Sequence, residues 1–187
     1  MSIAAELMQR VRQLEERLRT LEDDKAIREL LARYGFNADQ GRSDDFVALF
    51  ETDGALEVTL SKARAQGASI AEGDALASAG DVPGEDVVVR HEGHAALGAF
   101  IRDPKGHKAI EGMSLHLMGN NLVTRIDGDT ATAESYNLTI VRRGAQFHVI
   151  GAAVNIWHLV KIDGAWRIKE NRRRRPGTPG YQSILAE

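Results

Sequence analysis

The sequence of 187 residues contains no cysteine, carries little net charge and has no long apolar run. Without cysteine, the chain has no disulfide, thiolate nucleophile or cysteine-ligated metal centre. A net charge of −3 gives it no overall attraction for nucleic acid or an anionic membrane. No segment approaches the roughly 18 uninterrupted apolar residues of a membrane-spanning helix, and the first residues are too charged for a signal peptide. The sequence therefore predicts one cytoplasmic domain without a nucleic-acid or membrane partner.

A heptad stripe occupies residues 3 to about 22, which we expect to form a separate N-terminal helix within residues 1–23. Five large apolar residues are spaced 4, 3, 4 and 3 positions apart: Leu7, Val11, Leu14, Leu18 and Leu21. Such a helix has one narrow apolar seam that needs a partner. The partner is either the helix's own domain or another subunit, and we predict that the helix helps to build a homo-oligomer.

Residues 24–176 have the pattern of one α+β domain. A second helix is expected from about Lys25 to Gly41, with Tyr34 at the end of its apolar face. Asp-Gly and Gly turns then separate long β-rich runs, which predicts an antiparallel meander behind the helices. Residues 61–86 are expected to form a long loop, because they are rich in Ala, Gly and Ser. Residues 177–187 are expected to be a loop or docking tail.

Three polar residues in the helix and the first meander strand carry the chemistry that we expect: Tyr34, Asp39 and His116. A lone strand histidine is more often a core or edge residue. With a carboxylate on one ring nitrogen, however, the other nitrogen becomes a general base. A phenol can donate a hydrogen bond to a carbonyl or a leaving oxygen. These are the parts of an elimination or isomerisation site, although the sequence leaves open whether they meet.

Several other polar residues are secondary candidates. Asn120 shares strand parity with His116, and His158 lies in a later strand where it could line a pocket. His91 and His94 have a spacing that a metal could use, but no third ligand is evident, so we predict no metal site. The sequence also has no phosphate-cradling glycine loop.

The run IRELLARYGFNADQGRSDDFVALFETDGAL resembles the opening of the SnoaL-like branch of the nuclear-transport-factor-2-like superfamily. Its Tyr-x4-Asp-x-Gly spacing is present as Tyr34, Asp39 and Gly41. MSLHLMGNN resembles the strand with the catalytic histidine in scytalone dehydratase, bile-acid 7α-dehydratase and lindane dehydrochlorinase. DGDTATAESY and KIDGAWRI match later strands, so the resemblance covers about residues 8–175 apart from 61–86.

The resemblance implies a cone-shaped α+β barrel, with a curved mixed or antiparallel sheet, N-terminal helices and a deep apolar pocket. It implies that Asp39 and His116 form a dyad, that Tyr34 supplies the phenol and that Arg175 lies in the pocket. Thr139 departs from the bile-acid enzyme, which has an aspartate there. Related dehydratases suggest a trimer, although other members of the fold are dimers.

The expected function is therefore that of a cofactor-independent lyase or isomerase, most directly a dehydratase, with a hydrophobic cyclic carbonyl compound as substrate. His116 would remove a proton α to the carbonyl, and Tyr34 would stabilise the oxyanion or assist the departure of hydroxide. The alternative is a noncatalytic module that binds a small molecule or assembles subunits. An oriented base argues against this alternative, because a binding protein does not need one.

Overall fold

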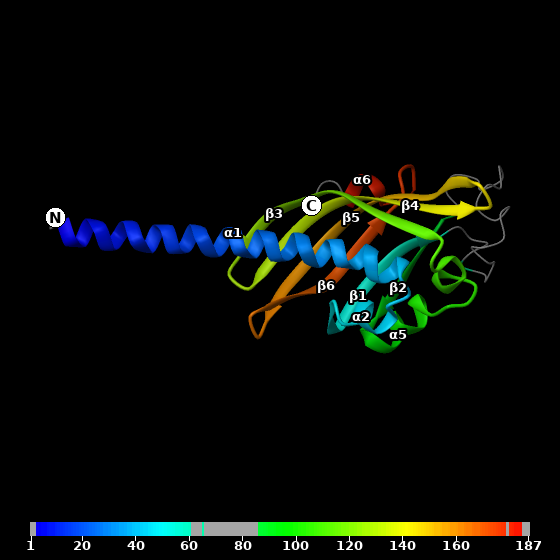
Figure 1. The fold of residues 1–187 in the computed structure, drawn as a ribbon, viewed down its shortest axis with the longest axis horizontal. Coiled ribbons are helices and arrows are strands. Elements are labelled where there is room, and N and C mark those ends of the chain that lie inside the picture. Colours follow the sequence, from blue (N-terminus) through cyan, green and yellow to red (C-terminus); the bar gives the residue numbers. More distant parts are fainter. Residues whose placement is uncertain (1–2, 61–64, 66–85, 179, 185–187) are drawn as a thin grey trace.

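Six strands of the described chain form one mixed sheet in the order β2-β1-β6-β5-β4-β3 (Figure 1). The computed structural model describes residues 3–60, 65, 86–178 and 180–184, so the loop predicted at 61–86 lies almost wholly outside the described residues. The strands are β1 (Phe50–Leu60), β2 (Val87–Glu92), β3 (Ser114–Asp127), β4 (Thr130–Arg143), β5 (Gln146–Ile162) and β6 (Ala165–Arg174). Neighbours are antiparallel except β1 and β6, which are parallel.

Glycines in left-handed conformations form the predicted hairpin turns. Gly128 (φ 59°) joins β3 to β4, Gly144 (φ 58°) joins β4 to β5, and Gly164 (φ 77°) joins β5 to β6. A residue without Cβ adopts these angles at little cost. The expected α+β fold, with a curved mixed sheet and N-terminal helices, is confirmed. The sheet is not closed into a barrel, since β2 and β3 are its two edges.

The N-terminal region is one continuous helix, α1 (Ile3–Asp39), so the prediction of two helices was wrong. The boundary expected near residue 23 contains neither glycine nor proline. Ion pairs one turn apart span it instead, with 2.7 Å between Arg28 Nε and Asp24 Oδ2 and 3.5 Å between Lys25 Nζ and Glu29 Oε1. The helix ends at Asp39, shortly before Gly41 with φ 66°, as the sequence predicted.

Only the second half of α1 packs on the sheet, and residues 3–22 are exposed throughout. Figure 1 shows this first half projecting beyond the rest of the molecule. The first polar anchor is Asp23, whose Oδ1 accepts hydrogen bonds from Lys161 Nζ at 2.6 Å and Trp166 Nε1 at 2.8 Å. The alternative in which the heptad seam packs on its own domain is therefore wrong, while its role in an oligomer stays a prediction.

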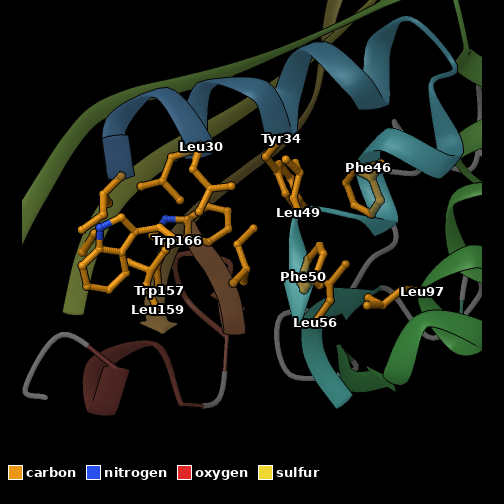
Figure 2. Close-up of a cluster of buried hydrophobic side chains, with 14 of the residues drawn as sticks. Leu30, Tyr34, Phe46, Leu49, Phe50, Leu56, Leu97, Trp157, Leu159 and Trp166 are labelled. Atoms are coloured by element: carbon orange, nitrogen blue, oxygen red, sulfur yellow. The ribbon is translucent and has the colours of Figure 1, made fainter. Parts of the chain in front are cut away.

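The core lies between the second half of α1 and the facing side of the sheet (Figure 2). Ile27 and Leu31 are fully buried there, on the predicted helix face. The short helices α2 (Ser43–Val47) and α5 (Gly93–Ile101) close one end, each with a buried apolar side chain, Phe46 and Leu97 respectively. Residues 107–110 form a single 3-10 turn, η1 (His107–Ile110), just before β3.

The outer face of the sheet is partly covered. Helix α6 (Tyr181–Ile184) buries Ile184 against Val154 and Ile156, so the C-terminal tail contains a docking segment. On β3, Leu115 and Leu117 also point outward, but they are 51% and 50% exposed. The described residues therefore leave about half of each leucine uncovered. None of the described helices is long and apolar enough to cross a membrane.

Candidate active site

Asp39 and His116 meet where the end of α1 lies against the start of β3. The distance from Asp39 Oδ1 to His116 Nδ1 is 2.6 Å, which confirms the predicted approach of the two side chains. Asp39 Oδ2 also accepts the backbone N–H of His116 at 2.7 Å, and Oδ1 accepts the Ser114 hydroxyl at 2.8 Å. The His116 side chain is only 6% exposed. Three donors thus fix the carboxylate, and the carboxylate fixes the imidazole ring.

The charge of Asp39 determines which ring nitrogen of His116 carries a proton. Burial raises the pKa of Asp39, but the hydrogen bonds and charge of His116, with the Ser114 hydroxyl, outweigh it and hold this pKa below its usual value. Asp39 is therefore ionised at neutral pH and can only accept hydrogen bonds. Nδ1 of His116 must then be the donor, which leaves Nε2 as the nitrogen that can take a proton.

Gly35 allows α1 to approach β3 this closely. A Cβ at this position would lie 2.7 Å from the backbone oxygen of His116 and 3.3 Å from its Cβ. The neighbouring atom in the first contact belongs to the backbone, so it cannot rotate away. The absence of a side chain at Gly35 therefore sets the distance between the helix that carries Asp39 and the strand that carries His116.

Replacing Gly35 with alanine is expected to destabilise the fold. Overpacking costs about 1–3 kcal/mol, more than the roughly 0.5–1 kcal/mol that alanine gains in a helix. The matched control is Gly98→Ala in α5, where a Cβ would approach the far end of the exposed Arg102 side chain, which can move aside, and would make only ordinary contact, at 4.0 Å, with Val47. Urea unfolding should show a loss for Gly35→Ala and no loss for Gly98→Ala. Equal stability of the two variants would contradict the close approach.

A second histidine, His107 from η1, stacks on His116. The ring centroids are 4.9 Å apart and the planes differ by 23°. The Nε2 atom of His107 is buried and has no hydrogen-bond partner among the described residues. Burial lowers the pKa of His107 to about 3, and the charges of His116 and Arg173 act in the same direction. His107 is therefore neutral at physiological pH and contributes a polar ring to the site without adding charge.

His107 is expected to make the protein less stable as the pH falls. An unfolded histidine binds a proton below about pH 6.5, whereas folded His107 resists it until about pH 3. In this window the unfolded state binds more protons, so stability decreases with decreasing pH, by about 1.4 kcal/mol per unit at most. His107→Gln cannot titrate, so urea unfolding should show a weaker pH dependence than in the wild type. Exposed His148→Gln is the control, and a His107→Gln dependence as steep as the wild type's would contradict the shift.

Tyr34 lies in the hydrophobic core, within an aromatic cluster (Figure 2). Its ring centroid is 4.8 Å from that of Phe46 and 5.2 Å from that of Trp157. Burial raises the pKa of Tyr34 to about 12, although the positive charge of Arg173 opposes this shift. The phenol therefore keeps its proton at physiological pH and remains a hydrogen-bond donor.

The arginine beside Tyr34 is Arg173 of β6, two residues before the predicted Arg175. Burial lowers the pKa of Arg173, and its guanidinium donates hydrogen bonds to Asn137 Oδ1 and, at 3.4 Å, to Thr139 Oγ1. Thr139, where the bile-acid enzyme has an aspartate, thus contributes a neutral acceptor. The guanidinium of Arg173 on β6 therefore lies together with the amide of Asn137 and the hydroxyl of Thr139, both on β4.

Two of the three remaining candidates, Arg175 and His158, make their described contacts elsewhere. Arg175 lies just beyond the end of β6 and forms an ion pair with Asp86 at 3.2 Å. His158 is 38% exposed, with its Nε2 atom 3.9 Å from Glu170 Oε2. Asn120 belongs to β3, but its side chain lies outside the described residues.

His91 and His94 each contact a phenylalanine of the chain, although the buried Nε2 atom of His91 has no hydrogen-bond partner among the described residues. The His94 Nε2 atom is hydrogen-bonded to the backbone oxygen of Phe50 at 3.1 Å, and the His91 ring lies 4.7 Å from that of Phe100. No group of three metal-ligating side chains is present in the described residues. A groove of about 990 Å³ between α1, α2 and the β5–β6 turn does not include Asp39 or His116 in its lining.

The chain belongs to the SnoaL-like domain family, whose pattern matches residues 19–172. No curated protein matches this sequence. Among solved structures, it is similar to a nuclear-transport-factor-2-like protein with a cystatin-like fold from Novosphingobium aromaticivorans. The two are 26% identical and superpose with a TM-score of 0.70 over 92% of this chain and 94% of that one.

Two more distant structures from the same organism share the fold. A candidate scytalone dehydratase is 18% identical, with a TM-score of 0.58 over 83% of this chain and 85% of that chain. The β subunit of a candidate aromatic-ring-hydroxylating dioxygenase is 17% identical, with a TM-score of 0.59 over 81% of this chain and 88% of that chain. The same architecture thus occurs in proteins named for different roles.

Proposed function

We propose that the protein is a cofactor-independent lyase, most directly a dehydratase, for a hydrophobic cyclic carbonyl compound. The observation that carries the proposal is the buried contact of 2.6 Å between Asp39 Oδ1 and His116 Nδ1. A histidine that a carboxylate orients in this way is typical of a general base. Membership of the SnoaL-like family and the likeness to a candidate scytalone dehydratase support this interpretation.

The reaction needs one proton acceptor and no redox partner. Nε2 of His116 removes the proton α to the carbonyl while Asp39 stabilises the resulting imidazolium. The electron pair of the broken C–H bond forms an enolate, which then expels the β-hydroxyl group and becomes an α,β-unsaturated carbonyl. The imidazolium returns the proton to the departing hydroxide, so water leaves and His116 is regenerated.

Polar groups of the interior match the charge that develops in this reaction. The enolate oxygen needs a donor or a cation, and the interior contains the protonated phenol of Tyr34 and the guanidinium of Arg173. His107 supplies an unpartnered polar nitrogen next to the His116 ring. We assign oxyanion stabilisation to Tyr34, with Arg173 as the nearby charge. The proposal also includes a homo-oligomer acting in the cytoplasm.

The alternative is a noncatalytic binding or assembly module, and the part of the sheet's outer face that the described residues leave exposed favours it. Leu117, Phe147 and Val149 are 50%, 67% and 62% exposed on strands that a partner could cover. The similar structure named as a dioxygenase β subunit belongs to an assembly by name. An assembly role does not need the oriented histidine, which is why we place it second.

The test is turnover of a panel of β-hydroxy ketones on fused-ring scaffolds. The proposal predicts that at least one compound loses one molecule of water, detected by mass, and gains the near-ultraviolet absorbance of an enone. No cofactor should be needed. Binding of the compounds without loss of water from any of them would instead support the noncatalytic module.

A further inference from the structure

The first half of α1 is a helix with an uncovered apolar seam. The seam residues are between 52% and 67% exposed: Leu7, Val11, Leu14, Leu18 and Leu21. Most helical stability in proteins comes from packing of an apolar face and not from helix propensity, so an uncovered seam points to a partner. The described part of the chain's own domain does not supply one, because α1 continues without a break away from the sheet (Figure 1).

The spacing of the seam assigns each residue a heptad position. Val11 and Leu18 occupy position a, while Leu7, Leu14 and Leu21 occupy position d. Leucine at every d position, with a β-branched residue at an a position, favours two strands over three or four. The composition of the seam therefore fits a pair of helices.

The charged residues beside the seam select the direction of the partner. Arg10 and Arg17 occupy position g, and Glu15 and Glu22 occupy position e. In a parallel pair, position g of one heptad lies beside position e of the next heptad on the partner, which places Arg10 beside Glu15 and Arg17 beside Glu22. In an antiparallel pair, g faces g and e faces e, so every contact between charged flank residues would join like charges, while Ile3 at g and Met8 at e are uncharged.

We propose that residues 3–22 form a parallel two-stranded coiled coil with the same segment of a second copy of this chain. The arginines at position g and the glutamates at position e identify the partner as a second copy of the segment. They meet as opposite charges when the two helices run parallel and in register. The coil ends where Asp23 joins α1 to the sheet through Lys161 and Trp166. Both domains therefore lie at the same end of the coil, related by a two-fold axis.

Two subunits differ from the trimer that the family resemblance suggests, and the coil does not depend on the chemistry of the dyad. A result against the dehydratase proposal would not bear on the coil, and a result against the coil would not bear on the roles of Asp39 and His116. The pairing is therefore tested by an experiment of its own. It asks whether one residue of the coil lies beside the same residue of the second chain.

Cross-linking through a single introduced cysteine tests both the pairing and its direction. The full chain has no cysteine, so Leu7→Cys gives one thiol at the seam, near one end of the coil. In a parallel pair the two thiols face each other, and mild oxidation of a dilute solution should link most chains into a dimer of twice 20.5 kDa. The matched control is Gln9→Cys, at position f on the opposite side of the helix, which should stay unlinked.

A second set of variants tests whether the seam holds the pair together. In the Leu7→Cys chain, Leu14→Glu with Leu18→Glu places charges in the seam and should abolish the cross-link without unfolding the domain. Gln9→Glu with Gln13→Glu adds the same charge outside the seam and should keep it. Equal linking through positions 7 and 9, no linking at position 7, or a three-chain mass in light scattering would overturn the proposal.

Discussion

Replacing His116 with alanine is expected to slow the dehydration by about 10²–10⁴-fold, because the reaction loses its general base. The fold should survive, since Asp39 keeps the Ser114 hydroxyl and the backbone N–H of residue 116 as donors. One lost hydrogen bond to a buried carboxylate costs about 1–3 kcal/mol, which lowers the melting temperature without unfolding the protein. The measurement is kcat/KM for the compound that turns over fastest, together with a thermal melt.

The matched control is His158→Ala, which removes an imidazole of β5 that is 38% exposed and lies beside Glu170. This variant should keep the wild-type rate. A fully active His116→Ala enzyme with a cooperative melt would show that His116 is a core residue and that the proposed mechanism is wrong.

The substitution Asp39→Asn is expected to lower the rate by about 10²–10⁴-fold as well, by disturbing His116 without removing it. Three donors converge on the two carboxylate oxygens, but an amide has only one oxygen. If the amide oxygen faces His116 Nδ1, the NH₂ group faces the backbone N–H of His116 and two donors oppose each other. If the amide is turned, the NH₂ group donates to Nδ1 and stabilises the wrong tautomer.

The loss should appear mainly in kcat, because Asp39 acts through His116 and does not need to contact the substrate. Exposed Asp45→Asn in α2 makes the same chemical change away from the site and should leave kcat unchanged. A rate close to that of the wild type in Asp39→Asn would mean that the carboxylate neither orients nor stabilises the imidazole.

The sequence predicted the elements of the sheet well because their signals are local. Asp-Gly and Gly turns marked the hairpins, and the glycines at 128, 144 and 164 adopt the left-handed angles that such turns need. The boundary near residue 23 was wrong for a related reason. Near residue 23 the apolar residues move to a different face of the helix. We interpreted this change as a break between two helices, although no residue there interrupts a helix.

The Asp39–His116 contact was predictable only through the resemblance to known dehydratases, because helix and strand periodicity leaves open whether the two side chains meet. His107 and Arg173 were missed because their positions depend on packing. The stacking of His107 follows from the path of η1, which no pattern marked. Arg173 lies in a run of four arginines, and the sequence does not show which of them enters the interior. In the structure β6 ends at Arg174, so Arg173 belongs to the strand and Arg175 does not.

The most direct test of the account is the tautomer of His116, measured by ¹⁵N NMR on histidine-labelled protein at a pH where this imidazole is neutral. The account predicts a protonated Nδ1 held by Asp39 and a bare Nε2, while exposed His148 reports the rapid exchange of both forms in the same spectrum. Asp39→Asn should disturb the His116 signals and leave those of His148 in place. A proton on Nε2 of wild-type His116, or averaging like that of His148, would contradict the claim that Asp39 prepares His116 as a base.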